Sequence, residues 1–259
     1  MGVLSNLRRF VERRPQLRVR RALLKIDGRS VEVILKADPR ARRFIVKVDS
    51  STGAVSVIAP STRSLERALE FAKKERDWIA DRLAIVPEPV RLAVGASVLF
   101  RGVEHVIRAS DGGNGPVWID KDTILPAIRV AGEPEHRQRR LLDWFKREAR
   151  RRIELRVAEY AAVLGVNPKR VTIRDTSSRW GSCSSTRNLS FSWRLVLAPP
   201  HVLDYVVAHE VAHLRELNHS PRFWRLVESL VRDVEGSTKW LADNGALLHR
   251  YAPRTGAIG

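Results

Sequence analysis

Residues 209–213 read His-Glu-Val-Ala-His, and this short run constrains the fold more than any other part of the chain. Two histidines four positions apart lie one turn apart on the same face of an α-helix, so both rings can reach one point. The preceding residues, 202–208, are mostly apolar and suit a helix. An apolar helix has to be covered by other elements, and a buried histidine needs a bonding partner. The sequence therefore predicts an inward-facing helix from about His201 to Leu217.

The same five residues indicate a metal site. Imidazole is a good ligand for Zn²⁺, and hydrolytic zinc sites use three protein ligands and keep a fourth position for water. His209 and His213 would supply two of these ligands. Glu210 points beside the ion, where its carboxylate can take a proton from the zinc-bound water. The pattern predicts a Zn²⁺-dependent hydrolase with Glu210 as general base.

A third ligand is needed, and His219 is our first candidate for it. It follows His213 by six residues, and its imidazole is softer than the carboxylates of the rival candidates, Glu228 and Glu235. A ligand close in sequence is also held more rigidly. With the helix ending at about residue 217, we expect Asn218 to adopt a left-handed conformation that returns His219 to the ion.

The rest of the chain divides into strands first and helices later. Apolar residues alternate with polar ones in residues 22–58 and 98–130, which predicts strands. Helical spacing predicts the following helices: 64–83, with Leu65, Leu69, Ala72, Trp78 and Ile79 on its apolar face, 135–164, and 221–234. A further strand is expected at 189–197, after a polar loop at 175–185. No internal repeat is apparent. We therefore predict an α+β fold, with a β-rich N-terminal half and a helical half that holds the His-Glu-x-x-His helix and a small β-hairpin.

Charge and cysteine content bear on partners and location. The chain has 47 Lys and Arg against 29 Asp and Glu, a formal net charge of +18, which favours phosphates and other anions. We find no recognisable nucleic-acid module, so nucleic acid is the weaker partner hypothesis. The arginines of the 135–164 helix are expected to be solvated. Cys183 is the single cysteine, which excludes an intramolecular disulfide and fits a reducing compartment.

Membrane association is not expected. No apolar run approaches the roughly 20 residues that cross a bilayer. The basic N-terminal segment contains no apolar stretch of the kind found in secretory signals. We therefore expect a cytoplasmic protein, and the sequence does not indicate its oligomeric state.

Several short motifs share the pattern of one family. They are Arg179-Trp180-Gly181-Ser182-Cys183-Ser184, Trp193-Arg194-Leu195, His209-Glu210-Val211-Ala212-His213, Asn218-His219-Ser220 and Phe223-Trp224. Together they resemble the YgjP-like (WGSC-type) metallopeptidases, distant relatives of the SprT-like zinc proteases. The resemblance covers about residues 20–245. It implies that His209, His213 and His219 are the zinc ligands and that Glu210 is the catalytic acid/base.

The Trp180-Gly181-Ser182 segment has two interpretations. Gly181 permits a close backbone approach, and Arg179 or backbone amides near the metal would stabilise an oxyanion, so residues 179–182 are candidate substrate or oxyanion contacts. Alternatively, Trp180 packs into the core and Ser182 bonds locally. Cys183 is disfavoured as a nucleophile because no group that would stabilise a thiolate is identifiable.

We accordingly expect four segments: a basic tail (1–20), a β-rich region (21–134), a zincin-like metallopeptidase domain (135–250) and a C-terminal tail (251–259). The leading hypothesis is a zinc peptidase that cleaves amide bonds in peptides or proteins with a Glu-activated water. The first alternative is a metal-dependent nucleoside triphosphate hydrolase, although no phosphate-binding glycine loop is present. The second is a nucleic-acid-associated protein with a structural zinc. Glu210 argues against it, because a structural zinc site does not need a general base.

Overall fold

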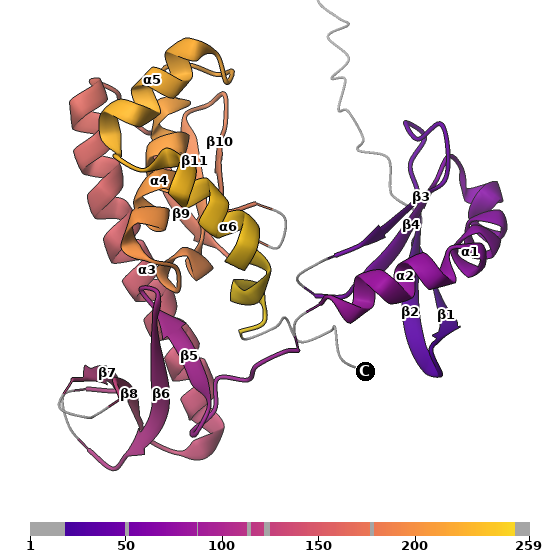
Figure 1. Ribbon diagram of the computed structural model, residues 1–259, viewed down its shortest axis with the longest axis horizontal. Coiled ribbons are helices and arrows are strands. Elements are labelled where there is room, and N and C mark those ends of the chain that lie inside the picture. Colours follow the sequence, from indigo (N-terminus) through magenta and orange to yellow (C-terminus); the bar gives the residue numbers. More distant parts are fainter. Residues whose placement is uncertain are drawn as a thin grey trace, which may run out of the picture. The chain divides into compact units, whose positions relative to one another are not determined.

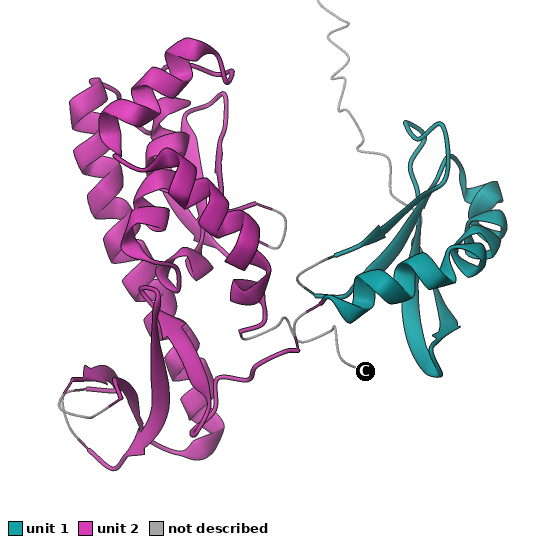
Figure 2. Cartoon of the chain, in the orientation of Figure 1, with its two compact units in different colours: residues 1–85 teal, residues 86–259 magenta. Residues whose placement is uncertain are grey.

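The computed structural model describes residues 19–49, 52–86, 88–112, 115–121, 125–176 and 179–251. The chain forms two compact units, residues 1–85 and residues 86–259 (Figure 2). Strands and helices occupy separate runs of the chain, which confirms the α+β class. The β-rich region predicted at 21–134 contributes to both units. Most of both predicted tails, residues 1–18 and 252–259, lies outside the described residues.

The first unit is a four-stranded sheet with helices on one face (Figure 1). Its strands are β1 (Val19–Ile26), β2 (Arg29–Ala37), β3 (Ile45–Val48) and β4 (Val55–Ala59), in the order β1-β2-β4-β3. Strand β2 is antiparallel to β1 and parallel to β4, and β3 is antiparallel to β4. Alternate residues such as Val33, Leu35, Val55 and Val57 are fully buried beneath the helices.

The helix predicted at 64–83 is two helices, α1 (Leu65–Lys74) and α2 (Arg76–Ala84), which follow the short 3₁₀ turn η1 (Thr62–Ser64). Glu75 falls on the line of buried positions 65, 68, 72 and 79, so an unbroken helix would direct its carboxylate into the core. Trp78, predicted on the apolar face, is instead 40% exposed, with the Arg82 guanidinium 5.4 Å from its ring.

The second unit begins with another four-stranded sheet. Its strands are β5 (Ser97–Phe100), β6 (Val103–Ser110), β7 (Val117–Asp120) and β8 (Ala127–Ala131), in the order β5-β6-β8-β7. Strand β6 is antiparallel to β5 and parallel to β8, and β7 is antiparallel to β8. The topology is therefore that of the first sheet, and a helix follows both. The structure thus contains a repeated module that the sequence alone did not indicate.

The first hairpin of each module has the same two-residue turn. Asp27 and Gly28 have φ of 47° and 75°, and Arg101 and Gly102 have φ of 54° and 77°. Positive φ at both central residues is the geometry of type I′ turns, which match the twist of a hairpin. In the second module the turn also anchors the sheet, because the Arg101 and Gly102 amides donate to the carbonyls of Val196 and Leu197 over 2.9 and 2.8 Å.

Helix α3 (Pro134–Leu164) is the 31-residue element that joins the second sheet to the region of the predicted metal site. Proline opens it, and it ends at the predicted boundary, where Gly165 adopts the left-handed conformation with φ of 62°. Its buried face includes Leu141, Phe145 and Ile153. The helix packs against β8 and, farther along, against α4 (Pro200–Ala212), so its core side connects the sheet with the predicted metal helix (Figure 1).

A small sheet, β10-β11-β9, lies beside α4. Its strands are β9 (Arg170–Arg174), β10 (Gly181–Cys183) and β11 (Asn188–Ser192); β11 is antiparallel to β10 and parallel to β9. The antiparallel pair β10–β11 forms a β-hairpin, but its first strand lies where we predicted a loop. The strand expected to reach residue 197 ends at Ser192, whose hydroxyl accepts from the Arg194 amide over 3.3 Å and starts the 3₁₀ helix η2 (Trp193–Val196).

Two further helices complete the unit: α5 (Pro221–Leu230) and α6 (Val234–His249). Helix α5 ends four residues before the predicted boundary, because the Asp233 carboxylate caps the new helix α6 by accepting from the Gly236 amide over 2.8 Å. Among the described residues, no helix is long and apolar enough to span a membrane.

Candidate metal centre

Helix α4 carries the first two histidines out of the protein core. Nine of its thirteen residues are buried, as the apolar segment predicted. His209 lies in its last turn, and His213 is its C-cap residue. One nitrogen each of His209, His213 and His219 lies within 4.8 Å of the other two, and the Nε2 atoms of His209 and His219 are 3.1 Å apart. The structure therefore brings together the three histidines that were predicted as ligands.

The chain reaches His219 by a different route from the one we predicted. Helix α4 ends at Ala212, not near Leu217, and the Leu214 and Arg215 amides then donate to carbonyls three residues back over 3.0 Å. Asn218 does not have a positive φ, so the predicted left-handed turn is wrong. A turn at residues 213–215 follows α4 directly, and the chain then leads to His219.

Helix α5 holds His219 in place from the other side. Ser220 is its N-cap, and the Ser220 hydroxyl accepts from the Phe223 amide over 3.3 Å, directly after His219. The Phe223 ring stacks on His213, with centroids 4.5 Å apart, and the Trp224 ring stacks on His219 at 5.8 Å. These two aromatic residues fix the planes of the imidazoles. From the sequence we had named them only as part of the family motif, although their place one turn after His219 is a usable signal.

Both α4 histidines favour the neutral form that a metal requires. Burial, with smaller contributions from the neighbouring His213 and His219, lowers the pKa of His209 to about 4. Burial also lowers the pKa of His213. His213 Nδ1–H donates to the Glu216 carbonyl over 3.0 Å, which leaves its Nε2 lone pair directed away from the backbone. Sequence could not identify this acceptor, because every residue has a carbonyl.

The cluster fits a tetrahedral zinc ion. Two nitrogens that bind one Zn²⁺ at about 2.0 Å lie about 3.3 Å apart. The observed 3.1 Å between the Nε2 atoms of His209 and His219 is close to that edge. Two imidazole lone pairs facing each other at this distance repel unless a proton or a cation lies between them. The donor set of three imidazoles is also one that catalytic zinc sites use.

Glu210 is the buried carboxylate next to these ligands. It is only 7% exposed, and burial raises its pKa to about 7, against the opposing effect of the Arg179 guanidinium. A carboxyl group that titrates near neutrality can both accept and return a proton. Its fixed position comes from β10: a Cβ atom on Gly181 would lie 2.5 Å from Glu210 Cγ, so only glycine fits here.

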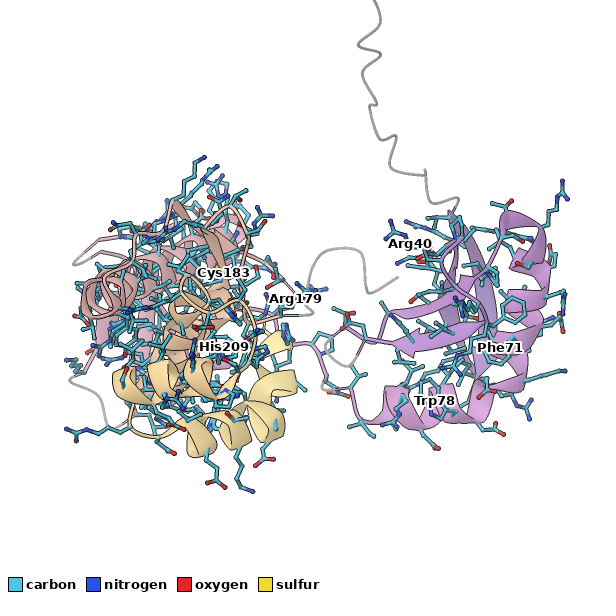
Figure 3. All side chains as sticks on the ribbon, turned by 90° about the horizontal axis from the view of Figure 1, so that it is seen from above. Arg40, Phe71, Trp78, Arg179, Cys183 and His209 are labelled. Carbon is cyan, nitrogen blue, oxygen red and sulfur yellow. The ribbon has the colours of Figure 1, made fainter. Side chains whose placement is uncertain are left out.

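The remaining residues of the Trp180 motif have separate surroundings. The Trp180 ring packs against His249 at a tilt, with ring centroids 4.8 Å apart, and fills the space above Gly245, which is the packing role that we considered. Ser182 pairs with Ser190 in the hairpin. Burial and the nearby Glu210 raise the pKa of the Cys183 thiol, which disfavours a thiolate. Figure 3 labels Arg179, Cys183 and His209 in this unit.

The rival carboxylates stand apart from the histidines. Within the described part of the chain, the group that could hold a metal contains no carboxylate, so neither Glu228 nor Glu235 belongs to it. Both side chains are exposed, on α5 and α6. The geometry therefore offers one set of candidate ligands, all of them histidines.

One of the comparisons with known proteins, the match to a family model, agrees with a metal-dependent hydrolase. The model of the YgjP-like metallopeptidase domain matches residues 42–244. Among curated proteins no sequence matches the chain. A crystal structure of the metallopeptidase zymogen abylysin from Pyrococcus abyssi is similar at 22% identity and a TM-score of 0.33, covering 38% of this chain and 97% of that chain.

Proposed function

Since the chain belongs to the YgjP-like metallopeptidase family, we propose that it hydrolyses amide bonds with a Zn²⁺ ion held by His209, His213 and His219. Family membership makes the chain a metallopeptidase-like hydrolase with peptide or protein substrates. The identity of the ion, its ligands and the general base are our proposals. The observation that carries them is that one nitrogen each of three histidines lies within 4.8 Å of the other two, and that Glu210, next to His209 on α4, is a buried carboxylate.

The chemistry divides between the ion and Glu210. When bound, Zn²⁺ polarises the scissile carbonyl and makes a water molecule more acidic. Glu210 accepts a proton from the attacking water and donates it to the leaving nitrogen. A pKa of about 7 in the metal-free protein agrees with both steps, because neither protonation state is strongly favoured. Arg179 is the nearby cation that would stabilise negative charge on the substrate oxygen.

Strand β10 is the element of this unit that we propose as the binding site for an extended peptide. In a sheet ordered β10-β11-β9, β10 is an edge strand with backbone groups free to pair, and it lies next to α4. Its neighbour β11 lies in the centre of the sheet and has no free edge. We therefore assign substrate alignment to residues 181–183.

The metal and the reaction are tested separately. Elemental analysis of protein prepared without chelator should show near-stoichiometric zinc in the wild type and in Glu210→Gln, and marked loss in His213→Ala and His219→Ala. Cleavage of an unfolded protein, followed by mass spectrometry, should disappear in Glu210→Gln although its zinc remains. A wild type that neither retains nor takes up zinc would remove the proposal. Hydrolysis of nucleoside triphosphates without peptide cleavage would instead favour the phosphoanhydride alternative.

A further inference from the structure

A second feature of this unit is a basic cleft that shares no residue with the metal centre. The cleft has a volume of about 430 Å³ and lies between α3 and the end of β9. Four cations line it: Lys146, Arg147 and Arg150 from α3, and Arg174 from β9. They belong to two elements far apart in sequence, so the fold itself brings their charges together.

Several arginines farther along the same helix are held in ion pairs. Arg151 and Arg152 donate to Glu148 over 3.0 and 3.1 Å, and Arg156 pairs with Asp204 at 2.9 Å. Ion pairing of this kind offsets the high arginine content of α3 along much of its length. The arginines of the helix are therefore less uniformly solvated than we expected from the sequence.

Three of the four cleft cations have no such partner. Within the described residues, no carboxylate lies within 4.0 Å of the side-chain nitrogens of Lys146, Arg147 or Arg174. Arg150 alone is paired, with Glu154 at 2.9 Å. Like charges that converge in this way repel one another, and an anion bound between them relieves the repulsion.

The two carboxylates of the cleft do not neutralise it. Asp175 is bound by Arg194, whose side chain is only 3% exposed and lies over the Trp193 ring at 4.6 Å. The charge of Asp175 is thereby compensated from inside the protein. Asp143 is the one lining carboxylate that remains to oppose the cations, and the cleft stays positive.

We propose that this cleft binds an anion that carries two or more phosphoryl groups. Guanidinium groups present planar, forked donors that match phosphate oxygens, and three of the four cations are arginines. Ile173 is the one apolar side chain in the lining, and no aromatic ring is there to stack on a base. Recognition therefore rests on the phosphates, which a free oligophosphate and a nucleic-acid backbone both offer.

The test compares two triple variants that remove the same charge from the zinc-loaded, full-length protein. The first replaces the unpaired cleft cations: Lys146→Gln, Arg147→Gln and Arg174→Gln. The control replaces three exposed cations on or beside the same two elements: Arg139→Gln, Lys169→Gln and Arg170→Gln. Unchanged zinc content and thermal unfolding establish that both variants are folded. Calorimetry with inorganic tripolyphosphate and anisotropy with a labelled single-stranded oligonucleotide then measure binding.

We expect the cleft variant to bind at least one probe about tenfold more weakly than the wild type, and the control variant to change by less than about twofold. For the oligonucleotide, loss of three phosphate contacts should make the dependence of log affinity on log salt shallower by about 2. If the effect appears with tripolyphosphate alone, the ligand is a free oligophosphate. If it appears with the oligonucleotide alone, the ligand is a nucleic-acid backbone.

Three results would overturn the proposal. Absence of binding to both probes in the wild type would remove the site. Equal losses in the two triple variants would show that binding follows net charge and not the cleft. Equally tight binding of a polyglutamate peptide, with the same sensitivity to the cleft variant, would make this a site for carboxylates. None of these results depends on whether the metal centre cleaves peptides.

Discussion

Replacing Gly181 by alanine tests how the protein positions Glu210. The added Cβ would lie 2.5 Å from Glu210 Cγ, 2.7 Å from Oε1 and 2.9 Å from Cδ. Ordinary contacts between carbon atoms are about 3.5–4.0 Å, so the side chain or β10 has to move by about 1 Å. Glu210 is only 7% exposed and has little free space in which to move.

A displacement of that size has two expected consequences. Misplacing a catalytic group by about 1 Å typically lowers the rate about 100-fold, so kcat/KM for peptide cleavage should fall by roughly that factor. The free energy of unfolding should fall by about 1–3 kcal/mol, the usual effect of overpacking. Zinc content should not change, because the contact involves Glu210 and none of the three histidines.

Elemental analysis, peptide cleavage and denaturant unfolding on the same preparation separate these effects. Gly112→Ala is the matched control, since a Cβ at Gly112 meets nothing within 4 Å. Wild-type activity in Gly181→Ala would refute the reasoning. So would a loss of activity that follows a loss of zinc, because the substitution would then act through the ligands.

Three further outcomes are expected. Ser220→Ala removes the cap of α5 and should lower the free energy of unfolding of the metal-free protein by about 1 kcal/mol in urea titrations. Zinc at 100 times its dissociation constant should raise the unfolding free energy of chelator-treated protein by about 2.7 kcal/mol, and His219→Ala should abolish most of this gain. Burial raises the pKa of Tyr160 to about 12, so its stabilising contribution is complete below pH 10 and is lost as the pH rises toward 12. Tyr160→Phe should therefore lose less stability than the wild type between these pH values, measured by urea unfolding at each pH.

Sequence patterns predicted those parts of the fold in which burial follows a regular period. Helix α3 and its terminal Gly165 are examples, since one broad face of a long helix is apolar. Strand β10 was missed because Gly181–Cys183 is too short to show alternation. We predicted that strand β11 would end at residue 197, but it ends at Ser192. All residues from Trp193 to Leu197 are buried, and their larger apolar side chains occur at alternate positions, which is also the pattern of a strand.

The sequence also predicted some parts of the candidate site and not others. The spacing of His209 and His213 on one helix face follows from helix geometry, so their proximity was predictable. The position of His219 depends on where α4 ends, and residues 213–216 have no helix-stopping residue that would reveal the end at Ala212. The contact between Gly181 and Glu210 joins segments about 30 residues apart, and no local pattern encodes it. The roles of these residues in metal binding and catalysis stay predictions.

The repeated sheet module has a consequence for the order in which the nascent chain folds. Each sheet is complete within a short stretch, residues 19–59 and 97–131, so both can close soon after synthesis, with few long-range contacts. The partners of α3 in η2 and α4 are synthesised later, and His219 later still. The three predicted ligands are therefore completed only after the second sheet can form, and an ion bound by them would find that sheet in place.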